Sequence, residues 1–187
     1  CRYNQGPIDC ILGIAQDHSL QAIDVEKVTV GMLEAGWDIV AAPEERKRNP
    51  LSLVEAQFSM PFSAAVALLY GQVSLNEYTE EILTAPQVKD LMARVQCVLD
   101  PDLEVNYPSM WPAWVEVETR DGRTIKSEVQ FPKGDSENPL SWDELKEKFR
   151  VLTAPVIPAS KQDEIISTVE ALEHLEDIRV LARMTGI

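Results

Sequence analysis

The sequence predicts an α+β fold, with a small, mainly antiparallel sheet packed with helices and followed by a helical carboxy-terminal tail. Two segments with alternating apolar residues flank the dipeptide Asp121-Gly122, a pattern that is typical of a β-hairpin. Apolar residues recur at helical spacing both before and after this hairpin. Strands gathered in one region and helices in others are typical of the α+β class.

The amino-terminal third is expected to contain a helix, a strand and a loop. Apolar residues from Pro7 to His18 keep helical spacing and predict an amphipathic helix. Valines between residues 25 and 30 predict a short strand. Residues 41–54 are polar and interrupted by proline, which predicts a loop.

Two further helices are expected before the hairpin. The segment Phe58–Tyr70 is almost wholly apolar and rich in alanine, and Gly71 follows it, which predicts a buried helix. Thr84 resembles an amino-terminal cap, with Pro86 in the first turn of the helix that follows.

The predicted sheet is completed by three segments. Val115 and Val117 alternate with glutamates on the first hairpin strand, and residues 125–131 supply the second. Val95–Leu99 is a candidate third partner. Downstream, a capping box at residues 141–144 and a leucine-rich region opened by Ser160 and Asp163 predict the helical tail.

The overall charge limits the classes of partner. The 187 residues include 17 Lys and Arg against 31 Asp and Glu, which gives a formal net charge of −14. Such a surface repels phosphate backbones and anionic lipid, so we expect no nucleic-acid and no membrane partner. The basic run Arg46-Lys47-Arg48 is read as a solvated loop, with an anion contact as the alternative.

The three cysteines, Cys1, Cys10 and Cys97, show no spacing that is typical of zinc sites or disulfide frameworks. We therefore expect reduced thiols, a cytoplasmic location and no metal. No apolar run is long enough to span a membrane. The opening Cys-Arg-Tyr-Asn is unlike a native amino terminus, so we expect the chain to be a fragment.

Taken alone, the residues indicate little chemistry. His18 and His174 lie in predicted amphipathic helices, where a surface or capping role is favoured over catalysis. The sequence contains no glycine-rich phosphate loop, HExxH helix or GxSxG elbow. These observations alone lead only to an acidic α+β domain.

Four segments resemble, in order, the MmgE/PrpD family, which includes 2-methylcitrate dehydratase, cis-aconitate decarboxylase and iminodisuccinate epimerase. Residues 1–9 (CRYNQGPID) are similar to the family segment in which a lysine, cysteines and a histidine precede an Ile-Asp pair. Residues 56–62 (AQFSMPF) resemble the AQFSLPY motif. The Asp-Gly hairpin with the later NPLS loop, and Lys148-Phe149 with the closing leucine-rich helix, match the remaining family segments.

The resemblance implies a two-domain, metal-independent lyase of di- or tricarboxylates, such as the dehydratase of propionate catabolism, with no cofactor. Residues 1–150 would form the α+β domain, and residues 151–187 would be helices that join a large helical domain missing from this chain. The resemblance also implies a small-molecule carboxylate substrate and a homodimer. Handling a proton next to a carboxylate requires a base and cationic stabilisers.

The same resemblance assigns site residues. Cys1 and Gln5 match the catalytic segment, but the family lysine lies upstream of this chain, and an amide cannot shuttle protons near neutral pH. The expected substrate-binding residues are Arg2, Ser59, Phe62 and Lys133, where Phe62 replaces the family tyrosine. Each has an alternative role. Arg2 would be part of a frayed terminus and Ser59 a helix cap, whereas Phe62 would be a core residue and Lys133 a turn residue.

Three functions are compatible with the sequence. The first is the carboxy-terminal part of such a lyase, expected to be inactive alone. The second is a non-catalytic binding or dimer-assembly domain, favoured by the replacements at Gln5 and Phe62. The third is an epimerase or isomerase variant of the family.

Overall fold

A four-stranded sheet with strand order β2-β1-β3-β4 lies at the centre of the computed structural model, which describes residues 1–186. The strands are β1 (Val25–Met32), β2 (Val95–Leu99), β3 (Ala113–Thr119) and β4 (Thr124–Val129). Only β1 and β2 pair in parallel; β1–β3 and β3–β4 are antiparallel. The predicted α+β class and mainly antiparallel sheet are confirmed.

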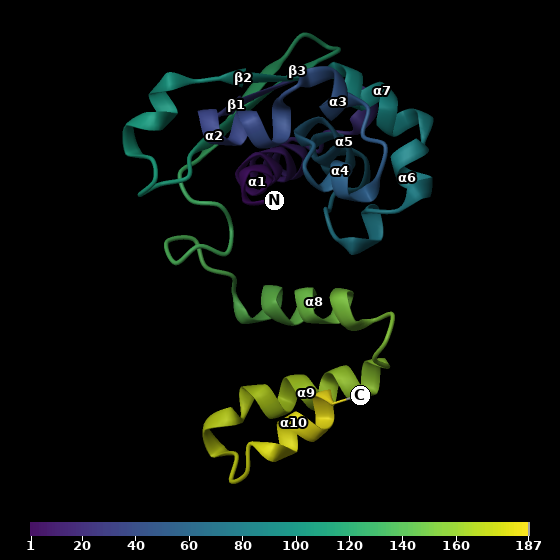
Figure 1. Ribbon diagram of the computed structural model, residues 1–187, viewed down its shortest axis with the longest axis vertical. Coiled ribbons are helices and arrows are strands. Elements are labelled where there is room, and N and C mark those ends of the chain that lie inside the picture. Colours follow the sequence, from purple (N-terminus) through teal and green to yellow (C-terminus); the bar gives the residue numbers. More distant parts are fainter. Residues whose placement is uncertain (187) are drawn as a thin grey trace. The chain divides into compact units, whose positions relative to one another are not determined.

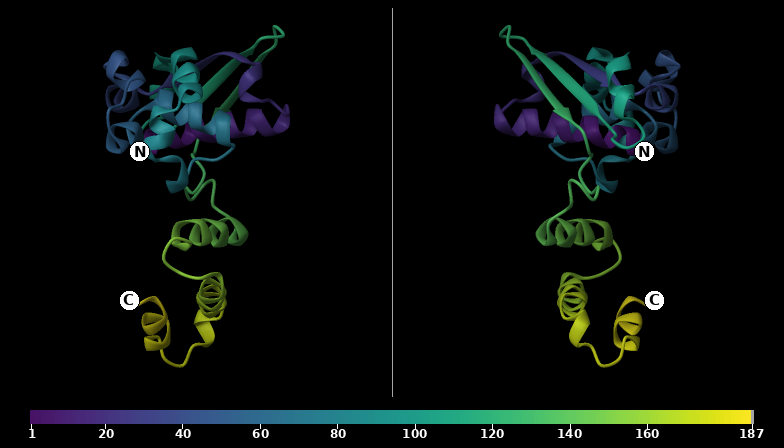
Figure 2. Two further views of the ribbon diagram at one scale, coloured as in Figure 1. Left: turned by 90° about the vertical axis from the view of Figure 1, so that its right-hand side faces the viewer. Right: turned by 90° about the vertical axis from the view of Figure 1, so that its left-hand side faces the viewer.

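One face of this sheet is apolar and buried. Side chains of β3 alternate along the strand, so Val115 and Val117 are buried whereas Glu116 and Glu118 are half-buried on the other face. Helices α1 (Arg2–Asp17) and α5 (Met60–Tyr70) pack beneath the strands, as Figures 1 and 2 show. The core of this part of the molecule lies between these helices and the sheet.

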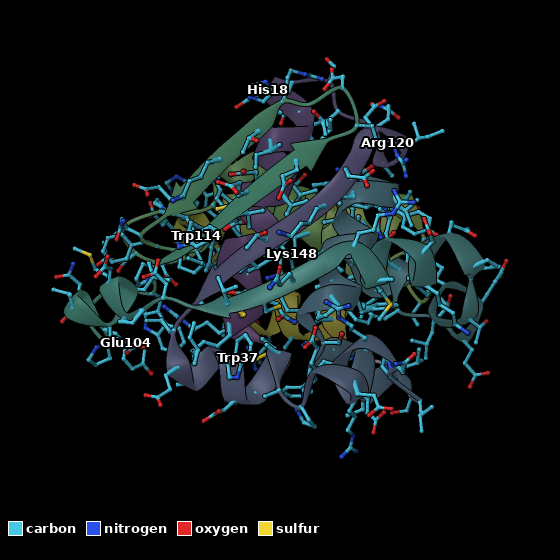
Figure 3. All side chains as sticks on the ribbon, turned by 90° about the horizontal axis from the view of Figure 1, so that it is seen from above. His18, Trp37, Glu104, Trp114, Arg120 and Lys148 are labelled. Carbon is cyan, nitrogen blue, oxygen red and sulfur yellow. The ribbon has the colours of Figure 1, made fainter. Side chains whose placement is uncertain are left out.

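The opposite face of the sheet is polar. Lys27 of β1 forms an ion pair with Glu118 of β3 at 3.3 Å, and Glu116 stands opposite Lys126 of β4. Figure 3 looks onto this face, with Trp114 and Arg120 toward opposite ends of β3 and helix α1 behind the strands. The alternating sequence predicts this arrangement, in which the apolar face of the sheet packs on the helices and the polar face points away from them.

Helix α1 begins earlier than the apolar spacing indicated. The prediction started at Pro7, but the helix already begins at Arg2 and continues through that proline. Proline in a helix interior removes one backbone hydrogen bond, which makes the start of a helix the usual place for it. Packing against the sheet here outweighs that local cost. His18 follows the helix as its carboxy-terminal cap and is exposed.

The prediction of a loop at residues 41–54 is wrong in part. Helix α3 (Glu44–Arg48) lies within this range, and α4 (Leu53–Gln57) begins there. The basic run ends α3 and is paired internally: Arg48 contacts Glu44 at 2.8 Å and Arg46 contacts Glu55 at 2.6 Å. The Glu44–Arg48 pair, four residues apart, stabilises the turn of α3, whereas the Arg46–Glu55 pair joins α3 to α4.

The buried helix expected at Phe58–Tyr70 is confirmed as α5, although it begins at Met60 because Phe58 ends α4 and Ser59 caps α5. Gly71 ends the helix with a φ of +66°. The cap predicted at Thr84 is displaced by one residue. Thr84 ends α6 (Glu80–Thr84), and Ala85 precedes α7 (Pro86–Arg94) in extended conformation. A residue before proline avoids the helical region, which places the break at Ala85.

Short helical segments complete the part of the chain up to Pro139. They are η1 (Ala22–Asp24), α2 (Glu34–Gly36), the π-helical segment η2 (Trp37–Ala41), η3 (Leu75–Glu77) and η4 (Pro101–Asn106). The hairpin between β3 and β4 turns at Gly122, whose φ of +88° is readily adopted only by glycine.

The described chain divides into two compact units, Cys1–Pro139 and a second that starts at Leu140. The second unit contains α8 (Trp142–Thr153), α9 (Ala159–Glu170), η5 (Leu172–His174) and α10 (Arg179–Thr185). The predicted capping box is present, since Ser141 and Glu144 bond reciprocally at the start of α8. Ser160 lies inside α9, whose cap position is Pro158.

Helices α8 and α9 form an apolar groove within the second unit. Its volume is about 260 Å³, and Trp142, Phe149 and Ile166 are among the residues that line it. Arg150 bonds to Asp163 at 2.6 Å and holds the two helices together. Within residues 1–186, no helix is long and apolar enough to cross a membrane.

Candidate functional site

The first turn of α1 carries three of the residues that the sequence singles out, and Arg2 is already engaged there. Its Nη2 lies 2.7 Å from Oδ2 of Asp135, and its guanidinium lies 4.2 Å from the ring centre of Trp111. Two such contacts hold a planar guanidinium in one orientation. Arg2 is therefore ordered by its partners, although 44% of its side chain is exposed.

Beside Arg2, two phenols face each other. The hydroxyl oxygens of Tyr3 and Tyr107 are 3.2 Å apart, and both rings pack against Trp111 at centroid distances of 4.9 and 5.4 Å. The hydrogen bond to Tyr107, together with burial, raises the pKa of Tyr3 to about 12. The Tyr3 phenol is therefore protonated at neutral pH and can donate a hydrogen bond.

Sequence reasoning missed this aromatic cluster, which we define as Tyr3, Tyr107 and Trp111. Its members come from α1 and from the segment between β2 and β3, more than one hundred positions apart. The only indication in the sequence was the unusual density of aromatic residues and prolines between Tyr107 and Trp111. Nothing in that density shows which helix the rings contact.

Lys133 lies on a loop, residues 131–138, that is fixed to α1. The backbone N–H of Lys133 donates to Oδ2 of Asp9 at 2.7 Å. Within the loop, the N–H of Gly134 donates to the carbonyl of Asn138 at 2.8 Å, and Asn138 Nδ2 donates to the carbonyl of Phe131 at 2.9 Å. The loop is thus a tight turn that lies beside α1. A role as a turn residue was the alternative predicted for Lys133.

Helix α1 approaches the end of β4 and the loop after it through a glycine. A Cβ built on Gly6 would lie 3.1 Å from Cγ1 of Val129 in β4, which is tight, and 3.8 Å from Cγ of Pro132, which is an ordinary contact. Arg2, Gly6 and Asp9 recur at helical spacing and face the loop together. Arg2 and Lys133, which the sequence predicts as site residues, are far apart in the chain but are brought together here. We call this place, where the start of α1 meets loop 131–138, the corner.

The remaining predicted residues fall in two places. Cys1 is the residue before α1 and Gln5 lies in its first turn; both are exposed and close to Arg2 in the sequence. Ser59 and Phe62 are fully buried at the start of α5. Ser59 Oγ accepts a hydrogen bond from the N–H of Phe62 at 3.1 Å and donates to the carbonyl of Lys47. Phe62 packs on Tyr78 at a centroid distance of 5.4 Å.

Asn4 links these two places. Its side chain is 2% exposed, and Nδ2 donates to the carbonyl of Gln57 at 3.2 Å and to Oγ of Ser63 at 3.1 Å. Ser63 Oγ in turn donates to the carbonyl of Ser59 at 3.0 Å. The first turn of α1 is therefore anchored on the motif at the start of α5.

The corner offers little enclosed space on its own. Arg2, Tyr3, Gly6, Trp111 and Pro132 are among the residues that line a recess of about 10 Å³. A volume of this size holds at most one water molecule. A di- or tricarboxylate could therefore contact this corner only as one wall of a larger site. Among residues 1–186, no group of three or more His, Cys, Asp and Glu side chains is arranged to hold a metal ion.

The chain is similar to proteins of one family. A family model described as the MmgE/PrpD C-terminal domain matches residues 1–174. The chain is 31% identical over 172 residues to the cis-aconitate decarboxylase-like protein oryM of Aspergillus oryzae, covering 89% of this chain and 34% of that protein. It is 31% identical over 137 residues to the cis-aconitate decarboxylase of Homo sapiens, covering 72% and 28%.

A third relative has a different activity in its name. The 2-methylcitrate dehydratase of Salmonella typhimurium is 26% identical over 166 residues, covering 85% of this chain and 33% of the dehydratase. The chain thus spans about a third of the length of the curated relatives it matches.

Proposed function

Because the MmgE/PrpD C-terminal domain model matches residues 1–174, this chain belongs to that family, and we propose that it forms part of a lyase acting on a di- or tricarboxylate. The relatives named as cis-aconitate decarboxylase and 2-methylcitrate dehydratase support this class of substrate. The activity belongs to the full-length protein, because the matched relatives are about three times as long as the chain.

The observation that carries this proposal is the corner where Arg2 and the Lys133 loop meet on α1. Negative charge develops next to a carboxylate when a neighbouring proton or carboxyl group leaves, and fixed cations and hydrogen-bond donors stabilise it. Arg2 is held in one orientation, and the Tyr3 phenol stays protonated. In this proposal the cationic side chains of Arg2 and Lys133 attract the substrate carboxylates. Of the two phenolic hydrogens of Tyr3 and Tyr107, one joins the two hydroxyl groups and the other is donated to the substrate.

We infer that this chain alone is inactive. The corner encloses only about 10 Å³, and Gln5 cannot exchange a proton near neutral pH. Phe62 has no phenol and is buried, and Cys1 is a single exposed thiol. The missing base and the second wall would come from the helical domain of the same protein, with a homodimer and a cytoplasmic location as further parts of the proposal.

The groove between α8 and α9 supports a role for the end of the chain in contacting that helical domain. It is lined almost wholly by apolar side chains, and Trp142 is 60% exposed in this chain. Apolar surface of this kind is covered in most stable proteins. The assignment of residues 1–150 and 151–187 to two domains of the full-length protein stays a prediction.

Turnover by the full-length protein tests the proposal. Cis-aconitate would be assayed by release of CO2, and 2-methylcitrate by formation of the unsaturated acid. We expect turnover of at least one acid, and a large loss in Lys133→Met with folding retained. The control is Lys89→Met, which removes an exposed lysine of α7. Turnover of neither acid would contradict the proposal for these substrates.

A non-catalytic binding or assembly domain is the second candidate, because Arg2 already has the carboxylate of Asp135 as a partner. This function predicts no turnover by the full-length protein, together with an oligomer that dissociates when Trp142 is replaced by serine. Light scattering coupled to size-exclusion chromatography would measure the oligomer.

A further inference from the structure

The half-buried Asp9 side chain is used by no step proposed so far. We propose that Asp9 is a positioning residue of the carboxylate site: its carboxylate holds the Lys133 loop against α1 and so fixes where the Lys133 side chain begins. This inference rests on the proposed function, since it assigns Asp9 to the same site.

The geometry separates two attachments between α1 and the loop. Near the start of α1, Arg2 bonds to Asp135 at 2.7 Å with 44% of the Arg2 side chain exposed. Two turns later, Asp9 Oδ2 accepts the backbone N–H of Lys133 at 2.7 Å. The second contact involves the backbone of the lysine itself, so it sets the position of that residue directly.

The loop is attached to α1 at Asp135 through Arg2 and at the Lys133 backbone through Asp9. Its internal hydrogen bonds join Gly134 to Asn138 and Asn138 to Phe131, and they shape the turn without attaching it to α1. Gly134 has a φ of +100°, a conformation that glycine adopts without strain. Loss of the Asp9 contact would therefore leave a well-formed turn that Arg2 still attaches at Asp135, but that lacks the direct hydrogen bond to the Lys133 backbone.

Asp9 also lies where it can serve this role without binding substrate. It follows Gln5 by four residues on the same face of α1, with the loop beside it. Burial raises the pKa of the Asp9 carboxyl group, and the N–H of Lys133 opposes this effect. A carboxylate that accepts a backbone N–H uses one oxygen for the loop.

The test uses three replacements of Asp9 in the full-length protein. Asp9→Asn keeps an oxygen acceptor in the same place, Asp9→Ala removes it, and Asp9→Glu keeps the charge but displaces the loop. We expect Asp9→Ala to raise KM for the carboxylate substrate about tenfold, the effect of losing one charge-assisted hydrogen bond, with kcat nearly unchanged. Asp9→Asn should restore KM, and Asp9→Glu should lie between.

A second readout does not depend on activity. Trypsin cleaves after lysine, so the rate of cleavage at Lys133 reports how firmly the loop is held. We expect faster cleavage there in Asp9→Ala and a wild-type rate in Asp9→Asn. Cleavage after Arg123, in the exposed hairpin turn, should keep its rate in every variant and serves as the control for general unfolding.

The outcomes are distinguishable. Unchanged cleavage at Lys133 in both Asp9→Ala and Asp9→Glu would overturn the attachment. Faster cleavage with unchanged KM would overturn the positioning role and leave Asp9 a structural residue. If the wild-type protein turns over neither acid, the proposed function fails and the positioning role fails with it, whereas the cleavage rates still decide whether Asp9 holds the loop.

Discussion

The indole of Trp114 lies across the backbone of Gly31, so closely that a Cβ built on Gly31 would stand 2.1 Å from Cε2 of the ring. The two residues are opposite each other in the β1–β3 pairing. Trp114 is fixed there by a hydrogen bond from Nε1 to Oδ2 of Asp100 at 2.6 Å and by Lys126, whose ammonium lies 4.5 Å from the ring centre. Glycine is thus required on β1 for this arrangement.

Replacement of Gly31 by alanine should therefore destabilise the protein. The added methyl group must displace the indole, and overpacking of this kind costs roughly 1–3 kcal/mol of unfolding free energy. Urea denaturation would measure the loss. The matched control is Gly13→Ala in α1, where nothing lies within 4 Å of the new Cβ; alanine should be neutral or stabilising there. Equal effects at both positions would contradict the packing described.

Asn4 should be more important for stability than its short polar side chain suggests. Asn4→Ala removes the donor to Gln57 and Ser63 in a buried place, and we expect a loss of about 1–3 kcal/mol. Asn4→Asp should be worse at neutral pH, because it buries a charge, and should recover partly in acid. Gln16→Ala, on the exposed end of α1, is the control and should change little.

Ser59 is expected to be important as a cap rather than as a substrate ligand. Its Oγ accepts from the N–H of Phe62 at the start of α5 and is fully buried. Ser59→Ala should lower the unfolding free energy by about 0.5–2 kcal/mol and leave KM unchanged when assayed well below the melting temperature. Ser52→Ala, at the exposed cap of α4, is the comparison. A KM effect at unchanged stability would instead favour the substrate-binding role.

Asp9 should make stability depend on pH. Burial raises its pKa in the folded protein above the unfolded value of about 4, so its contribution is greatest below that pH and is lost as pH rises through the folded pKa. Asp9→Asn cannot ionise and should gain stability relative to wild type as pH rises from about 4 toward neutrality. If the stability curves of wild type and Asp9→Asn ran parallel across this range, burial would not be the dominant influence on the pKa of Asp9.

Much of the fold could be predicted because its elements carry local patterns. The alternation around Val115 and Val117, the turn at Gly122 and the apolar run of α5 each indicate one element without knowledge of the rest. Packing between distant segments decided the remaining boundaries. Helix α1 continues through Pro7 where it packs against the sheet, and α3 packs on α5 and α7 although its polar sequence resembles a loop.

The site was less accessible to sequence reasoning. Resemblance indicated Arg2 and Lys133, but neither the Asp135 partner of Arg2 nor the attachment of Lys133 to Asp9 follows from any local pattern. These contacts join positions more than 120 residues apart, so only the folded chain reveals them. The roles of Cys1, Gln5 and the other assigned residues stay predictions.

The most direct test of the account compares two proteins in one assay: the full-length protein and the 187-residue chain alone, each incubated with cis-aconitate and with 2-methylcitrate. The measured quantity is the initial rate of CO2 release or of unsaturated acid formation. We expect turnover by the full-length protein and none by the chain alone. Turnover by the isolated chain, or by neither protein, would contradict it.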